Sequence, residues 1–121
     1  MMAPNTYASD CPTRLILDRI ANKWSVLVLS LLTVESLRFN ELRRRIEGIS
    51  QKMLSQTLRS LERDGLVNRS VFATVPVTVE YSITPLGRTL SATVDSLRLW
   101  AEAHFTDVLG AQRRYDGAAQ N

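Results

Sequence analysis

Residues 39–65 read FNELRRRIEGISQKMLSQTLRSLERDG, and this stretch decides the fold. Its first part has apolar residues four positions apart, which predicts a short helix over 41–46. Asn40 stands just before this helix, and asparagine is a residue type that caps helix N-termini well. The segment 47–49 then predicts a three-residue turn, because Gly48 tolerates the left-handed backbone conformation.

The second part of the stretch predicts a longer amphipathic helix over 51–64, with Ser50 as its N-cap. Leu54, Leu58 and Leu61 recur at helical spacing and therefore form the buried stripe of this helix. Two helices joined by a turn of this length are typical of a helix-turn-helix.

The sequence before the helix-turn-helix predicts two further helices. Asp10 can cap a helix over 12–21, and Pro12 suits its first turn. A second helix over 23–34 is apolar on nearly all sides, so we expect it at the centre of the fold. The segment 36–39 is too short for a helix and predicts a connecting edge strand.

The sequence after the helix-turn-helix predicts a β-hairpin and a long helix. Residues 66–71 and 77–83 alternate between apolar and polar side chains, as two paired strands do. Thr84, followed by proline, marks the start of a helix over 85–109, which Gly110 should end. The expected fold is mainly α with a small β-hairpin. It is a winged helix-turn-helix, with a three-helix core, the hairpin as its wing and a long C-terminal helix.

Size and composition indicate one domain over residues 11–110, with flexible tails over 1–10 and 111–121. The chain has one cysteine and one histidine, which argues against an internal disulfide and against a metal site. There is no phosphate-binding glycine loop and no acid–base set, so we expect neither an enzyme nor a cofactor. No secretion signal or membrane-spanning segment is recognisable, so we expect a cytoplasmic protein with no membrane partner.

Positive charge is concentrated in the middle of the chain. Residues 38–69 carry eight Lys and Arg against four acidic residues, although the net charge of the whole chain is only +3. The outward stripe of the helix over 51–64 has glutamine, which can pair with adenine, and arginine and lysine, which can pair with guanine. We therefore predict that double-stranded DNA is bound by twelve residues: Arg38, Asn40, Arg43, Arg44, Ser50, Gln51, Lys52, Ser55, Gln56, Arg59, Arg63 and Arg69.

Two other interpretations of this charged surface stay open. It can be an ordinary solvated helix face, or the winged helix can be a protein-interaction module that binds no DNA. The wing is a weaker candidate for DNA contact than the helix. Arg69 is the one residue of the wing that we expect to contact DNA, and the tip Thr74-Val75-Pro76 lacks a basic residue.

A set of spaced motifs runs through most of the chain: Cys11-Pro12, Lys23-Trp24, Arg38-Phe39-Asn40-Glu41-Leu42, Gly48-Ile49-Ser50, Met53-Leu54, Leu61-Glu62, Asp64-Gly65-Leu66, Val79-Glu80-Tyr81 and Thr84-Pro85-Leu86-Gly87. With these motifs the sequence resembles the HxlR family of bacterial regulators over about residues 11–105. The resemblance implies a winged-helix homodimer on a palindromic operator, with the first and last helices in the interface. The family includes repressors and activators. One minor departure is Ala21-Asn22, where a glycine pair is common in the family.

The residues themselves also indicate a homodimer. The helix over 85–109 carries more apolar surface than a small core can cover, and such a surface usually marks an interface. The alternative is that this helix packs only on its own domain. The predicted interface residues are Leu15, Leu90, Val94, Leu97, Trp100, Ala101 and Phe105.

Cys11 is a candidate redox sensor. Some members of the resembled family sense oxidants or electrophiles through a cysteine at the matching position. The helix dipole and Arg14 would favour a thiolate at Cys11, whereas Asp10 opposes it. Because the chain has no second cysteine, a switch would use an intersubunit disulfide. The alternative is a small capping or packing residue.

A small-molecule effector is a further candidate partner. A pocket between the helices over 23–34 and 85–109 and the dimer interface could be lined by Trp24, Phe39, Trp100 and Tyr81, although each of these residues also suits an ordinary core. We interpret His104 as a plain helix residue rather than as a ligand site.

Overall fold

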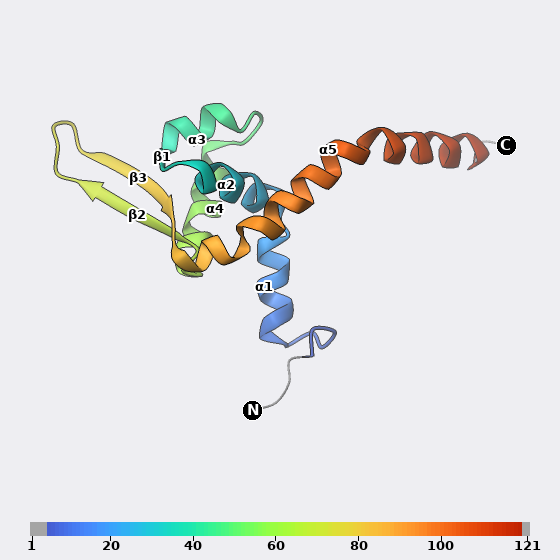
Figure 1. The fold of residues 1–121 in the computed structure, drawn as a ribbon, viewed down its shortest axis with the longest axis horizontal. Coiled ribbons are helices and arrows are strands. Elements are labelled where there is room, and N and C mark those ends of the chain that lie inside the picture. Colours follow the sequence, from blue (N-terminus) through green and yellow to red (C-terminus); the bar gives the residue numbers. More distant parts are fainter. Residues whose placement is uncertain (1–4, 120–121) are drawn as a thin grey trace.

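The computed structural model describes residues 5–119 and contains five helices and three strands within that range (Figure 1). In chain order the elements are α1 (Pro12–Ile20), α2 (Lys23–Val34), β1 (Leu37–Arg38), α3 (Phe39–Arg45), α4 (Gln51–Arg63), β2 (Val67–Phe72), β3 (Thr78–Ile83) and α5 (Pro85–Ala119). The predicted fold class is confirmed: the chain is mainly helical, with a small antiparallel sheet and a long C-terminal helix.

The sheet has the strand order β1-β3-β2, so β3 is the central strand. Tyr81 of β3 pairs with Leu37 on one side and with Arg69 on the other. The β2–β3 hairpin projects from the helical body as the wing, and α5 extends away on the opposite side (Figure 1).

The hydrophobic core surrounds α2, as its apolar sequence predicts. Val28, Leu29 and Leu32 of α2 are at most 1% exposed. The predicted stripe of α4, Leu54, Leu58 and Leu61, is buried against the same core. Burying a leucine side chain contributes about 2 kcal/mol, so the stripe fixes which face of α4 remains outside.

Local capping explains where most helices begin. Ser50 Oγ accepts a hydrogen bond from the Met53 backbone N–H at 3.0 Å, which confirms Ser50 as the cap of α4. Gly48 has a φ of 87°, as the predicted turn requires. Thr84 Oγ1 accepts from the Gly87 N–H at 2.9 Å, and this bond confirms the predicted start of α5.

Two predicted caps were wrong. Helix α3 already begins at Phe39, so Asn40 lies inside its first turn, and Glu41 Oε1 instead accepts from the Arg38 N–H at 2.9 Å. A carboxylate three residues into a helix can reach back in this way. Helix α1 has Cys11 rather than Asp10 at its N-cap, without a side-chain hydrogen bond.

The predicted end of the last helix was also wrong, because α5 continues through Gly110 to Ala119. One glycine costs a helix about 1 kcal/mol, and the alanine, glutamine and arginines that follow are good helix formers. The predicted C-terminal tail is therefore helical as far as Ala119. Residues 1–4 and 120–121 of the predicted tails lie outside the described residues.

Candidate nucleic-acid interface

The outward face of α4 carries the polar residues that were predicted to read DNA. Lys52, Gln56, Arg59 and Arg63 are exposed and lie opposite the buried stripe of the helix. The hydroxyl of Ser50 accepts the capping hydrogen bond, so this residue also serves to position the helix. The rotation of α4 about its axis therefore directs its long polar side chains to solvent.

A groove runs between α4 and the wing. It consists of two adjoining hollows of about 620 Å³ and about 400 Å³ that share Ser55, Arg59 and Tyr81. We call it the helix–wing groove, and its lining is Phe39, Gln51, Lys52, Ser55, Leu58, Arg59, Glu62, Arg69 and Tyr81. The structure thus brings Arg69 of the wing into one groove with the N-terminal half of α4. Glu62 is an acidic residue at this groove.

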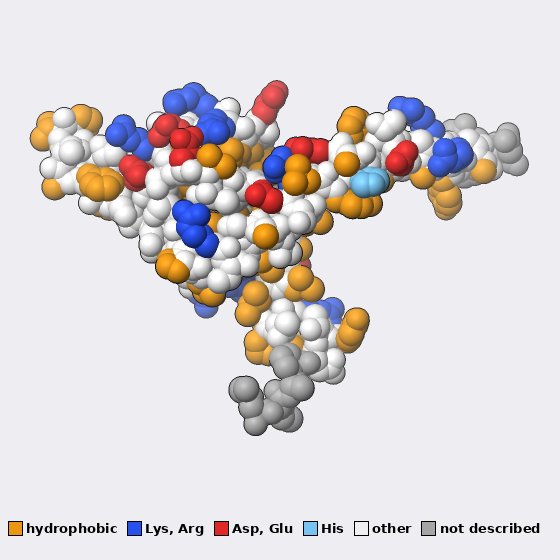
Figure 2. All heavy atoms as spheres, in the orientation of Figure 1, with side chains coloured by type: hydrophobic (Ala, Val, Ile, Leu, Met, Phe, Trp, Pro, Cys, Tyr) orange, Lys and Arg blue, Asp and Glu red, His pale blue; other side chains and the backbone are white. Residues whose placement is uncertain are grey.

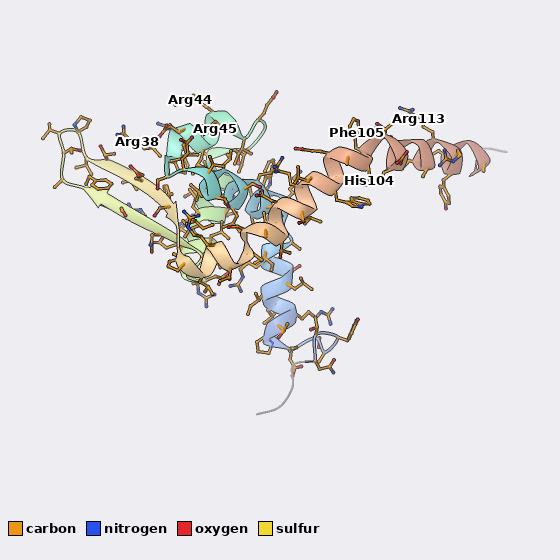
Figure 3. All side chains as sticks on the ribbon, viewed as in Figure 1. Arg38, Arg44, Arg45, His104, Phe105 and Arg113 are labelled. Carbon is orange, nitrogen blue, oxygen red and sulfur yellow. The ribbon has the colours of Figure 1, made fainter. Side chains whose placement is uncertain are left out.

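Other predicted DNA-binding residues lie outside the helix–wing groove. Arg38, Asn40 and Arg44 line a separate open hollow of about 790 Å³ against the outer part of β3. Figure 3 shows Arg38 and Arg44 on the side of the molecule formed by α3. Gln56 lines a third hollow with residues of α1 and α2. Arg43 and Arg63 are exposed and line none of these hollows.

The predicted DNA-binding cations are not used in ion pairs. Among the described residues, salt bridges of up to 4.0 Å involve only Arg19 with Asp64, Arg45 with Glu35, and Arg98 with Asp95 and Glu102. No acidic partner within this range of the chain neutralises the following side chains: Arg38, Arg43, Arg44, Lys52, Arg59, Arg63 and Arg69. These cations are therefore free to bind an external anion.

Helix α5 leaves the core after Val94. Among residues 95–118 no side chain is buried, and Leu97, Trp100 and Phe105 are each more than half exposed. Leu15 on α1 is equally exposed. Figure 2 shows apolar side chains along both projecting helices. Large apolar side chains exposed in this number usually mark an interface with another chain.

Two of the predicted interface residues do not lie on this surface. Val94 is 4% exposed and belongs to the core of its own chain, so its assignment to an interface was wrong. Leu90 is half-buried against the same core. Both face α2, because α5 must first pack on its own domain before it can project from it.

The comparisons with known proteins identify the chain. The model of the HxlR-like helix-turn-helix family matches residues 19–108. The chain belongs to the HxlR family. It is 44% identical to YtfH of Escherichia coli, an uncharacterised HTH-type transcriptional regulator, over 89% of this chain and 86% of that protein.

Solved structures agree with this assignment. YtfH from Salmonella typhimurium matches with a TM-score of 0.85 and 44% identity, over 93% of this chain and 99% of the other. The redox regulator HypR in its oxidised form matches with a TM-score of 0.72 and 43% identity, over 77% of this chain and 96% of the other. As a member of the HxlR family, the protein is a transcription regulator and not an enzyme.

Cys11 of this HxlR member lies at the N-terminus of α1 and is 8% exposed, but it is not part of the hydrophobic core. Burial raises the pKa of its thiol, but the backbone N–H groups of Arg14 and Thr13 at the helix start outweigh this effect, so the pKa lies below its ordinary value. The N–H groups at a helix start stabilise a thiolate in this way. The start of α1 therefore favours the thiolate form of Cys11.

A cavity of about 340 Å³ lies where α2, the end of α3 and α5 meet, which is the region predicted for an effector pocket. None of Trp24, Phe39, Trp100 and Tyr81 contributes to this cavity, so the predicted lining stays a prediction. Its lining is Leu27, Ser30, Leu31, Val34, Arg45, Ile46, Glu47, Asp95 and Arg98. Sequence periodicity did not indicate this set, because it combines residues from three elements that are far apart in the sequence.

The described residues offer neither a membrane-spanning segment nor a cluster of metal ligands. No helix among them combines the length and the apolar character needed to cross a membrane. Within the same range, no three His, Cys, Asp or Glu side chains gather in a group that could hold a metal ion.

Proposed function

We propose that the protein is a sequence-specific DNA-binding regulator that acts as a homodimer on a palindromic operator. The observation that supports this most strongly is the set of exposed cations on α3, α4 and the wing that have no acidic partner among the described residues. Each cation that neutralises a phosphate releases a counterion, which is the main source of affinity for duplex DNA.

In the proposed complex α4 enters the major groove with Lys52, Gln56 and Arg59 toward the base edges. A two-fold dimer joined through α5 and α1 would place its two α4 helices about one DNA turn, roughly 34 Å, apart. The symmetry of the operator would then follow from the symmetry of the protein.

A winged-helix protein-interaction module is the alternative. Such a module would have to cover the unpaired cations along one face, and burying a charge without a partner costs several kcal/mol. The free cations therefore favour DNA as the partner.

We expect Arg59→Ala to weaken operator binding about 5- to 150-fold, because a bidentate arginine–guanine contact contributes roughly 1–3 kcal/mol. The operator is first obtained by sequencing the duplexes that the purified protein retains from a random pool. Dissociation constants are then measured by fluorescence anisotropy at two salt concentrations.

Arg113→Ala is the matched control, because Arg113 is also exposed but lies far along α5 (Figure 3). This variant should bind as the unmodified protein does. Binding that is absent, or that does not change with salt, would contradict the proposed function. An equal loss on operator and unrelated DNA would assign Arg59 to phosphate rather than to a base.

We further propose that Cys11 makes this regulator sensitive to oxidants. Two observations support the proposal: the lowered pKa of the thiol, and the similarity of the chain to HypR, a redox regulator. In the proposed reaction, the Cys11 thiols of two subunits lose two protons and two electrons to a peroxide. An intersubunit disulfide forms, and the peroxide is reduced to water.

The reactivity of Cys11 can be measured directly, since it is the only cysteine in the chain. We expect the rate of alkylation by iodoacetamide to rise with pH at a midpoint below that of the same chain unfolded in guanidinium chloride. Peroxide should yield a covalent dimer on non-reducing gels and change operator binding, and Cys11→Ser should abolish both effects. Equal midpoints for the folded and unfolded chain would refute the lowered pKa. Operator binding that is indifferent to peroxide would refute the switch.

A further inference from the structure

We propose that Tyr81 binds a DNA phosphate, with its hydroxyl as a hydrogen-bond donor at the floor of the helix–wing groove. This inference rests on the proposed DNA-binding function and adds to it a contact that the sequence did not indicate. Sequence reasoning placed Tyr81 in the core or beside an effector, because it lies in an alternating strand.

The aromatic ring of Tyr81 is held firmly. Tyr81 stands in the central strand β3, between Leu37 of β1 and Arg69 of β2. It is 9% exposed and belongs to the hydrophobic core cluster. A ring fixed in this way can present its hydroxyl in only one direction, so little conformational entropy is lost when the hydroxyl binds a partner.

The hydroxyl itself has no hydrogen-bond partner among residues 5–119. None of the side-chain hydrogen bonds among the described residues involves Tyr81 Oη. Within the same part of the chain, Asp64 Oδ2 is the one buried side-chain N or O atom that lacks a partner, so Tyr81 Oη remains in contact with solvent. The ring is in the core, and both hollows of the helix–wing groove include Tyr81, so the hydroxyl reaches solvent at the groove. A tyrosine hydroxyl in such surroundings usually has a hydrogen-bond partner.

The position of the groove indicates which partner this is. If α4 lies in the major groove and the wing lies beside the duplex, the sugar-phosphate strand that separates the two DNA grooves must pass between them. The helix–wing groove is the space between those elements, and Lys52, Arg59 and Arg69 line it. Tyrosine hydroxyls are among the common donors to DNA phosphates, and phosphate contacts fix the register of the protein on the duplex.

Tyr81→Phe tests this inference, because it removes only the hydroxyl and leaves the buried ring in place. We expect binding to weaken about 3- to 10-fold on the operator and on an unrelated duplex alike. The dependence of affinity on salt concentration should not change, because tyrosine is uncharged and releases no counterion. The melting temperature of the free protein should also stay the same. Tyr115→Phe is the matched control, because Tyr115 is 77% exposed on the distant part of α5.

Ethylation interference provides a second readout that does not depend on overall affinity. One phosphate per half-site should be sensitive to ethylation with the unmodified protein and insensitive with Tyr81→Phe. Unchanged affinity and an unchanged ethylation pattern would overturn the inference. So would a loss confined to the operator, or a loss that accompanies a lower melting temperature. If the unmodified protein binds neither duplex, the proposed function itself fails, and this result is distinct from a failure at Tyr81 alone.

Discussion

Replacing Gly87 with alanine should lower the free energy of unfolding by about 3 kcal/mol, because the new methyl group has no space. A Cβ atom at this position would lie 2.3 Å from the backbone oxygen of Leu66 and 2.7 Å from Cγ1 of Ile83. The Leu66 oxygen cannot move freely, since it accepts a hydrogen bond from the Thr84 N–H at 3.1 Å. The clash therefore requires a shift of backbone where α5 begins.

Gly117→Ala is the control for this experiment. Gly117 also lies in α5, but apart from its chain neighbours and the nearby helix backbone no described atom lies within 4 Å of a Cβ built there. Alanine should leave stability unchanged or increase it by up to about 1 kcal/mol, as in an open helix interior. Urea unfolding at one fixed protein concentration measures both variants, because dimerisation makes stability depend on concentration. Equal unfolding midpoints for the two variants would show that the start of α5 tolerates the methyl group.

Three local features of the helix-turn-helix were predictable from neighbouring residues, although the caps predicted at Asn40 and Asp10 were wrong. The cap at Ser50, the turn at Gly48 and the stripe of α4 all follow from spacing within a few residues. These features fix the helix-turn-helix and the outward face of α4. The exposure of the residues predicted on that face follows directly from them.

Features that depend on residues far apart in the sequence were not predictable. Val94 and Trp100 occupy similar places in the apolar pattern of α5. Val94 is buried in the core of the chain, whereas Trp100 lies beyond that core and is exposed. The helix–wing groove depends on the pairing of β3 between β1 and β2, which places Tyr81 and Arg69 beside α4. The helix end predicted at Gly110 was wrong for another reason. A single glycine ends a helix only where the residues after it are poor helix formers, and α5 continues to Ala119.

Placing a charge on the exposed apolar surface of α5 should separate the proposed dimer into monomers. Phe105 is 59% exposed in the single chain. Its ring does not pack against the hydrophobic core formed by the described residues. In a two-fold interface Phe105→Glu would introduce the carboxylate on both subunits. Burying each carboxylate without a partner costs several kcal/mol. We therefore expect sedimentation velocity to show a monomer at micromolar concentrations at which the unmodified protein is a dimer.

The same variant should bind the operator more than about 100-fold more weakly, although α4 and the wing are untouched. In a dimer, binding of one half-site holds the second α4 near the other half-site at a high effective concentration, and a monomer loses this advantage. Val75→Glu is the control for oligomeric state, because Val75 is equally apolar and fully exposed but lies at the tip of the wing. It should leave the dimer intact. A dimeric Phe105→Glu protein would place the interface elsewhere. A monomeric variant with full operator affinity would instead show that one subunit suffices, and would remove the reason to expect a palindromic site.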